Sequence, residues 1–517
     1  MTHKIREVYI VHHSHTDVGY TDLQEQVIYN QANNIRRAVE LIENGIKNNT
    51  TQKDLKWNCE TWYCVEQFFK MATEEEKEKF FDLVKKGNIG LSANYLNFND
   101  LADCKYLKEK IHTMQEICGE KGIQIKPAMI ADINGISMGQ RDALIENGVE
   151  FLYTNIHTHH GMYPLYQNQK PYFWENENGQ RLLVWNGEHY NLGNALGIVL
   201  NKNDYFGKKN GDVTGLLENL HTNLAASIKE YKENGYPYDF YITSVSGVFS
   251  DNAPINPAIA DTVALFNEKY GEEVTMHMVT LQELYDKIRD KVQDAPVYRG
   301  AINDWWGNGV GSTPYAVKHY KEAVRLNHIC DRLEEKTGVH NEELIQAYGD
   351  NSLLYAEHTW GHSATVTNPY DTMVTNLDMR KNSYASKAHE AAAMRKNEQC
   401  HKLGDILRYY NLSGKVKAVS TSHQKRVFPV EFYVETLSLS AVKVTDDKTK
   451  QEMEVQLSAH PRGVLISFLA EFEPMEEKTF TYEEQPAPSQ TLFTRTAWVG
   501  AERVRDIVNT YDPETCR

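Results

Sequence analysis

The alternation of apolar runs with amphipathic stretches over residues 5–290 most constrains what this chain can fold into. The apolar runs are short and β-like, and apolar residues at helical spacing fill most of the intervals between them. Such β-α repetition predicts parallel strands with covering helices, as a sheet or a closed barrel. We expect strands at 8–12, 55–59, 89–93, 127–131, 151–153, 182–185, 240–244 and 275–279, and helices at about 24–48, 74–86, 104–121, 138–147, 214–233, 256–269 and 281–291.

The pattern changes twice further along the chain. Residues 314–336, 341–357 and 376–410 carry helical apolar spacing, which indicates an antiparallel bundle. From residue 413 the apolar period falls to two, so a β-rich, sandwich-like module is expected. The predicted domains are therefore a β/α barrel over 1–293, a helical bundle over 294–412 and a β-rich domain over 413–517. The last stretch has no evident closing element, and we expect a further β region beyond it.

Composition narrows the class of protein. The chain has 517 residues, 41% of them hydrophobic and 24% charged, which fits several globular domains. A net charge of −16 without a dense basic block argues against nucleic acid as a partner. The absence of a signal segment and of any apolar run near ~18 residues predicts a cytoplasmic protein with no membrane contact. Seven scattered cysteines favour reduced thiols, and homo-oligomer formation stays open.

The first strand ends in a run of polar residues that can bind a metal. Side chains alternate along a strand, so His13, His15 and Asp17 point the same way if strand geometry persists. Imidazole and carboxylate ligands suit a divalent ion such as zinc, which can polarise a substrate oxygen. The alternative is a polar loop whose histidines are merely solvated or bonded to backbone.

Two further clusters carry candidate ligands. Asp132 ends an apolar strand and precedes the turn at Gly135, where it either serves a site or caps the next helix. His358 interrupts the end of a predicted helix, where, taken alone, it reads as a buried core or interface histidine.

Together these motifs resemble glycoside hydrolase family 38, the α-mannosidase family, and more closely a divergent bacterial branch of it. Residues 13–20 (HSHTDVGY) are similar to the opening H-S-H-x-D-x-G-W of the family, and residues 132–137 (DINGIS) to its D-x-F-G-H-S segment. His358 lies where the H-H-D segment of the family supplies a ligand. Residues 57–60, 87–90 and 99–100 follow in the order of the landmarks W-x-x-E, K-G-x-x-E and N-D-E, so the resemblance spans about residues 5–365.

The resemblance implies a fold and a chemistry. The fold is α/β, with a seven-stranded β/α barrel, then a three-helix bundle and β-sandwich modules. The chemistry is metal-dependent hydrolysis of an α-linked sugar with retention, in which Asp132 is the nucleophile. Asp304 is the candidate proton donor, since residues 303–314 resemble the acidic segment and Y-W-x-G-Y-x-S-R-P of the family. One Zn²⁺ per chain, or another divalent ion, would be held by His15, Asp17, Asp132 and His358.

The substrate is expected to be a carbohydrate, but its identity is less constrained. The chain differs from the motifs of the family at Tyr20, Asn134, Ile136 and residues 357–360. These differences leave the four candidate metal ligands in place but change the residues expected to contact the sugar. Mannose is therefore not predicted as the specific substrate. A metal-dependent carbohydrate deacetylase on a similar barrel and a non-catalytic carbohydrate-binding protein remain alternatives. The predicted substrate contacts are Tyr20, Asn99, Asp100, Asp251 and Trp305, of which the aromatic ones can stack on sugar rings.

A run of histidines follows the strand predicted at 151–153. His157, His159 and His160 can form a second metal site or line the substrate cleft. Because no carboxylate accompanies them at ligand spacing, we predict an exposed loop instead.

Overall fold

The computed structural model describes residues 4–158, 161–199, 213–247, 251–404, 412–436 and 439–486. The chain divides into two compact units. The first comprises Met1–His328 with Asn341–Lys396, and the second Ile329–His340 with Asn397–Arg517. The three domains expected from the sequence divide the chain differently, and their boundaries stay a prediction.

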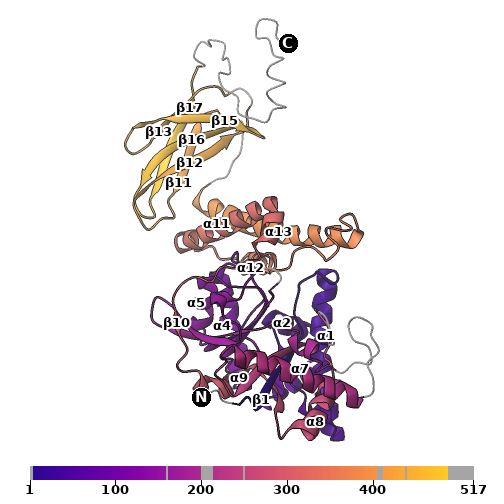
Figure 1. Cartoon of the computed structure of the whole chain (residues 1–517). Coiled ribbons are helices and arrows are strands. Elements are labelled where there is room, and N and C mark those ends of the chain that lie inside the picture. The colour runs from indigo at the N-terminus through magenta and orange to yellow at the C-terminus, as the bar shows by residue number, and fades with distance from the viewer. Residues whose placement is uncertain are drawn as a thin grey trace, which may run out of the picture. The chain divides into compact units, whose positions relative to one another are not determined.

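Parallel strands form the centre of the first unit (Figure 1). The first strand, β1, lies between β8 and β9 and is parallel to both. A second ladder runs in the order β10-β6-β7-β5-β4, and a third pairs β2 with β3. The strands are β1 (Glu7–His13), β2 (Trp57–Cys59), β3 (Ile89–Leu91), β4 (Pro127–Asp132), β5 (Phe151–Ile156), β6 (Lys170–Glu175), β7 (Arg181–Gly187), β8 (Phe240–Ser246), β9 (Thr275–Val279) and β10 (Val297–Tyr298).

The expectation of a closed seven-stranded barrel needs correction, because the described strands form separate ladders and no closed barrel. One reason lies in β2 and β3, which are only three residues long. The side chain of Asn58 bridges neighbouring strands there: its Nδ2 donates to His12 O (3.3 Å) and Val279 O (3.1 Å). A second reason is β6, an antiparallel strand beside β7 that the sequence pattern did not predict.

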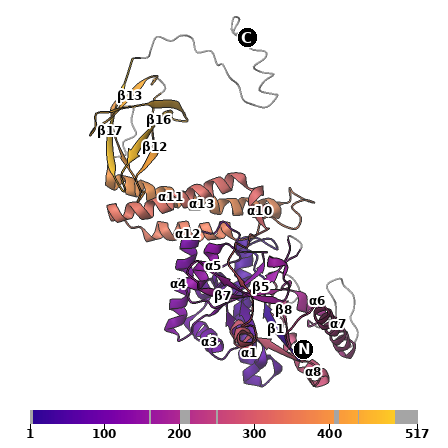
Figure 2. The ribbon, with the colours of Figure 1, turned by 60° about the vertical axis from the view of Figure 1, so that its left-hand side comes forward.

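Helices lie on both sides of the strands in the first unit. Figure 2 shows β7, β5, β8 and β1 with α3 and α4 on one side and α7 and α8 on the other. This coverage explains why β1 and β8 are almost wholly buried, and why each contains consecutive apolar residues where a strand with one exposed face would alternate. The helices are α1 (Gln24–Asn48), α2 (Trp62–Met71), α3 (Glu74–Lys85), α4 (Cys104–Glu120), α5 (Met138–Glu146), α6 (Leu192–Leu196), α7 (Val213–Glu233), α8 (Ala258–Tyr270) and α9 (Leu281–Ile288).

Longer helices follow, as the apolar spacing predicts. After the short α10 (Gly307–Ser312) come α11 (Pro314–Thr337), α12 (Glu342–Ala356) and α13 (Thr372–Leu403). Within the first unit these three helices share a small apolar cluster built from Ala323, Leu326, Tyr348, Ala388, Ala391 and Ala392. Small side chains let the helices approach closely, and the end of α12 carries the residues of the candidate site.

The second unit is β-rich, in agreement with the change of period near residue 413. It has two antiparallel sheets, in the orders β11-β17-β13-β14 and β12-β16-β15. Its core includes Ile466, Phe468 and Phe480. The strands are β11 (Gly414–Val419), β12 (Arg426–Val434), β13 (Val442–Asp446), β14 (Glu452–Met453), β15 (Val455–His460), β16 (Gly463–Phe472) and β17 (Glu477–Glu484). In the described part of the chain, no helix combines the length and apolarity that a bilayer crossing requires.

The Asn58 bridge yields a stability prediction. Asn58 is fully buried, and Leu281 N also donates to its Oδ1 (2.8 Å). We expect Asn58→Leu to lower the free energy of unfolding by about 2–4 kcal/mol, because it leaves buried backbone groups of His12, Val279 and Leu281 unpaired. Urea unfolding followed by tryptophan fluorescence measures this. The exposed Asn48→Leu is the control and should change stability by less than about 0.5 kcal/mol; equal effects of the two variants would contradict the prediction.

Candidate active site

Four buried side chains from three distant segments meet at one point of the first unit. His15 and Asp17 follow β1, Asp132 is the last residue of β4, and His358 follows the end of α12. All four are at most 5% exposed. The carboxyl ends of the strands thus deliver the polar residues to one place, as expected for an α/β fold.

The ligand atoms of these side chains are spaced for one cation. His358 Nε2 lies 3.2 Å from Asp17 Oδ1 and 3.4 Å from Asp132 Oδ2. His15 Nε2 lies 3.4 Å and 3.7 Å from the same two oxygens. A tetrahedral ion with ligand bonds of about 2.0–2.2 Å separates its ligands by about 3.3–3.6 Å. The four residues therefore form a group that can hold a divalent ion.

Two buried carboxylates fix the orientation of the two imidazoles. Glu60 Oε1 lies 3.1 Å from His15 Nδ1, and Glu357 Oε1 lies 2.8 Å from His358 Nδ1. Each ring therefore turns its Nε2 toward the centre, where both Nε2 atoms are buried and lack a hydrogen-bond partner. Buried polar atoms are nearly always satisfied, and a cation between these two nitrogens would satisfy both. Carboxylate-oriented histidines are the usual outer shell of a metal site, and the residues present fit a divalent ion.

Electrostatics also favours a cation at this point. Burial lowers the pKa of His15, but Glu60 and Asp17 raise it by more, so the net shift is well upward. His358 behaves likewise through Glu357, Asp132 and Asp17. The same contacts hold the pKa of Asp17 and of Glu60 below the usual range despite burial. The site thus attracts positive charge, which a divalent ion supplies more fully than two ring protons do.

Lys381 extends the support of His358. Its Nζ donates to Leu354 O (3.0 Å), Glu357 O (2.8 Å) and Glu357 Oε2 (3.3 Å), and it lies 4.1 Å from the centroid of the Trp360 ring. Burial lowers the pKa of Lys381 to about 8, although Glu357 acts in the opposite direction. This buried ion pair holds the Glu357 carboxylate in place beneath the ligand.

The backbone of Asp132 and the turn after it are tightly constrained. Asp132 has a φ of 76°, in the left-handed region that few residues other than Gly and Asn occupy. A Cβ added at Gly135 would lie 2.6 Å from Ile302 O, so the turn tolerates only glycine. The two oxygens of the Asp132 carboxylate at this bend have different surroundings: Oδ2 faces His15 and His358, while Oδ1 is buried without a hydrogen-bond partner.

A cavity of about 240 Å³ opens beside the four ligands. Tyr190 lies on its wall, stacks on the His15 ring with 4.4 Å between centroids, and donates to Asp251 Oδ1 (2.7 Å). Polar and aromatic walls around carboxylates suit a carbohydrate. The lining residues are Asp17, Tyr20, Asp132, His157, Tyr190, Asp251, Trp306, Asn308, Gly309, His358, Thr359 and Trp360.

The predicted substrate contacts divide into two groups. Tyr20 and Asp251 line the cavity, together with three of the predicted metal ligands. Trp305 is 55% exposed and packs against Gly161, and its neighbour Trp306 lines the cavity instead. Two other predicted contacts, Asn99 and Asp100, are not among the lining residues, and neither is Asp304, the predicted proton donor.

Several site residues were not assigned a role from the sequence. Glu60 is named in the sequence analysis only as the last residue of the W-x-x-E landmark. Its position directly after β2 could have indicated a polar group at a strand end. Asn97 was also missed: its Nδ2 donates to Glu60 Oε1 (2.7 Å) and its Oδ1 accepts from Ala131 N (3.2 Å). Lys381 lies within α13 and had no sequence signal.

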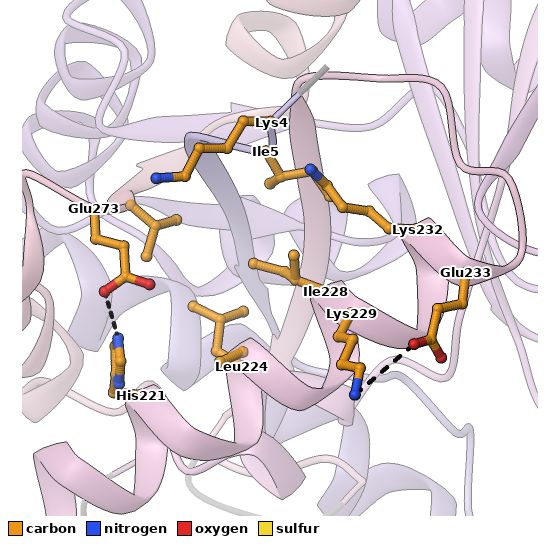
Figure 3. Close-up of a pocket in the computed structure, with 11 residues that line it drawn as sticks. Lys4, Ile5, His221, Leu224, Ile228, Lys229, Lys232, Glu233 and Glu273 are labelled. Atoms are coloured by element: carbon orange, nitrogen blue, oxygen red, sulfur yellow. Dashed lines mark hydrogen bonds and ion pairs between the residues drawn. The ribbon is translucent and has the colours of Figure 1, made fainter. Parts of the chain in front are cut away.

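A second cavity, of about 300 Å³, lies beside α7 and contains none of the predicted site residues (Figure 3). Its centre is apolar, with Ile5, Leu224 and Ile228. Charged residues surround these, and His221 Nε2 lies 3.0 Å from Glu273 Oε2. Nothing in this composition resembles the ligand set of the first cavity.

Comparison with known proteins identifies the family. Residues 6–301 match the glycosyl hydrolases family 38 N-terminal domain. The chain belongs to glycosyl hydrolase family 38. In fold, this family 38 chain is similar to an alpha-mannosidase from Enterococcus faecalis V583, with 13% identity, a TM-score of 0.62 and coverage of 96% of this chain and 57% of the other. A second structure, a protein in the Glycosyl Hydrolase Family 38 from Enterococcus faecalis, has 12% identity, a TM-score of 0.57 and coverage of 96% and 55%.

The family 38 chain thus spans a little over half the length of these two structures. No curated protein is significantly similar to it in sequence. At such low identity the two structures support the fold alone.

The support of His358 by Glu357 can be tested directly. Glu357→Gln removes the charge that orients Nδ1, and we expect it to weaken divalent-ion binding by about 10–100-fold, as loss of an outer-shell partner does. Competition with a metal-sensitive dye measures the affinity. Glu343→Gln, an exposed change on the same helix α12, is the matched control. An affinity within twofold of the unaltered protein would show that Glu357 has no such role.

Proposed function

We propose that the protein is a metal-dependent glycoside hydrolase of the α-mannosidase type, which cleaves an α-linked sugar with retention. Membership of family 38 supports the reaction class. The observation that carries the proposal is the convergence of His15, Asp17, Asp132 and His358 beside a polar, aromatic cavity, with both imidazole Nε2 atoms lacking partners. The ion is proposed to be zinc, which favours such nitrogen and oxygen ligands.

In this proposal Asp132 is the nucleophile. Oδ1 is the attacking oxygen, because Oδ2 faces His15 and His358 and Oδ1 has no hydrogen bond to hold it. Attack on the anomeric carbon forms a glycosyl-enzyme ester, which water then hydrolyses. A bound divalent ion supplies a Lewis acid for the sugar hydroxyls and helps distort the ring.

A retaining enzyme also needs an acid to protonate the leaving oxygen, and geometry favours Asp251 over Asp304. Asp251 lines the cavity, and burial together with Asp17 raises its pKa to about 6. Burial raises the pKa of Asp304 to about 7, but Asp304 is not among the lining residues and accepts a bond from Trp306 N (3.0 Å). An acid must reach the glycosidic oxygen, so position decides before pKa. Tyr190, which donates to Asp251, would orient its carboxyl group.

The proposed nucleophile is tested by Asp132→Asn. We expect activity on aryl α-glycosides to fall at least about 10³-fold, because an amide cannot form the ester intermediate. A 2-fluoro glycoside should label Asp132 covalently, as detected by peptide mass spectrometry. The exposed Asp378→Asn is the control. Labelling of another carboxylate would overturn the assignment of Asp132 as nucleophile. Acetate release from acetylated sugars without glycoside cleavage would favour the deacetylase. Binding of sugars without turnover would favour the non-catalytic protein.

The proton donor is tested by comparing Asp251→Asn with Asp304→Asn. Loss of the acid should slow cleavage of glycosides with poor leaving groups by about 10²–10⁴-fold and spare those with good ones. We expect this leaving-group dependence for Asp251→Asn and a change below tenfold for Asp304→Asn. The reverse pattern would return the role to Asp304, as the sequence predicts.

A further inference from the structure

A second group of potential metal ligands surrounds the other oxygen of Asp132. Asp132, His157 and His189 offer one ligand atom each, and these atoms lie within 4.8 Å of one another. His157 Nε2 is 4.0 Å from Asp132 Oδ1, the oxygen turned away from His15 and His358. His157 lines the cavity, and its ring centroid lies 4.5 Å from that of His189.

The prediction of an exposed loop at residues 157–160 is wrong for His157. It rested on the lack of a carboxylate at ligand spacing in the sequence. Asp132 provides the carboxylate from a different strand, and the His157 side chain is only 13% exposed. His159 and His160 lie outside the described residues.

The charge around the first site also leaves room for another cation. When the imidazoles are neutral, the positive charges of one divalent ion and Lys381 are fewer than the negative charges of the surrounding carboxylates. The region therefore still attracts positive charge. Asp132 Oδ1 is buried and without a hydrogen-bond partner, which makes it the oxygen open to a further ligand. The carboxylates concerned are Asp17, Glu60, Asp132 and Glu357, all of them buried.

We propose that Asp132 Oδ1, His157 and His189 form a second, weaker divalent-cation site, and that an ion bound there inhibits the enzyme by occupying the nucleophilic oxygen. The proposal rests on the proposed function, in which Oδ1 attacks the sugar. One ion at the first site then activates, and a second ion at higher concentration blocks attack and fills part of the cavity.

The ligand set explains why the second site is the weaker one. It has three protein ligands where the first has four, and its two histidines are only partly buried. His189 Nδ1 accepts a bond from Asn191 N (3.3 Å), so Nε2 carries the proton in the neutral ring. Binding through Nε2 requires this proton to move to Nδ1 and breaks the Asn191 bond. His15 and His358 have no such cost, because their Nδ1 atoms face carboxylates.

The experiment is a zinc titration of the metal-free full chain. Equilibrium dialysis with elemental analysis measures the bound zinc, and hydrolysis of an aryl α-glycoside is measured at the same zinc concentrations. We expect two binding events of unequal affinity, with activity rising through the first and falling through the second. His157→Ala and His189→Ala should each weaken the second event by more than the roughly 10–100-fold typical of an outer-shell change and leave the first event in place. In both variants, inhibition by excess zinc should disappear together with the second binding event. Inhibition is measured relative to the activity that each variant has with one bound ion. The exposed His112→Ala is the matched control and should keep both events.

The outcomes separate this proposal from the proposed function. A single ion at saturating zinc, or a second ion that survives in both His157→Ala and His189→Ala, overturns the inhibitory site and leaves the first site intact. If His15→Ala keeps the tight ion, the first site is wrong and the proposed function fails with it. Two ions with no loss of activity would show that Oδ1 is not the attacking oxygen, which overturns the inhibitory role.

Discussion

The candidate site depends on the pairing of buried carboxylates with imidazoles. Glu60 is fully buried and contacts His13 Nδ1 (2.7 Å), His15 Nδ1 and Asn97 Nδ2, so it joins the ends of β1 and β2 to the loop after β3. Burying such a charge without partners would cost several kcal/mol. The carboxylate therefore stabilises the fold only when these donors surround it, and the same donors then hold His15 in the orientation that a metal requires. Stability and site geometry here depend on one set of contacts.

Glu357 plays the corresponding part where α12 ends. Besides contacting His358 and Lys381, it accepts from Thr359 Oγ1 (2.6 Å), whose single hydroxyl hydrogen is shared with Asp17 Oδ1 (3.1 Å). The helical segment is thereby connected to Asp17, a candidate ligand that follows β1. This arrangement fits the departure from the H-H-D-A segment that the sequence analysis noted. In the sequence Glu357-His358-Thr359-Trp360, the candidate ligand His358 is preceded by its carboxylate support, and Trp360 packs against Lys381, which pairs with that carboxylate.

The sequence predicted the strands of the first unit well and their closure poorly. Apolar runs located β1 and β4 to within a residue or two because both are buried on both faces. The three-residue strand β2 is instead connected to β1 and β9 by the side chain of Asn58, which periodicity cannot reveal. The four candidate ligands came from motif resemblance, since no local pattern connects His15 with His358. Lys381 and Asn97 act through contacts between distant segments and could not be inferred. Trp305 was predicted as a substrate contact because it adjoins the proposed site in sequence, whereas the structure places its neighbour Trp306 in the cavity lining.

Asp132 is where the constraints of fold and site meet. Its left-handed backbone would be easiest for glycine, and holding another residue there costs of order 1 kcal/mol. Glycine has no carboxylate, so the cost is the consequence of placing an acid at the sharp turn that ends β4. At this turn Oδ2 lies 3.4 Å from His358 Nε2, while Oδ1 lies 4.0 Å from His157 Nε2. The strained backbone therefore places the two oxygens of one carboxylate beside two different groups of imidazoles. In the proposed function one of these oxygens binds the ion and the other attacks the sugar.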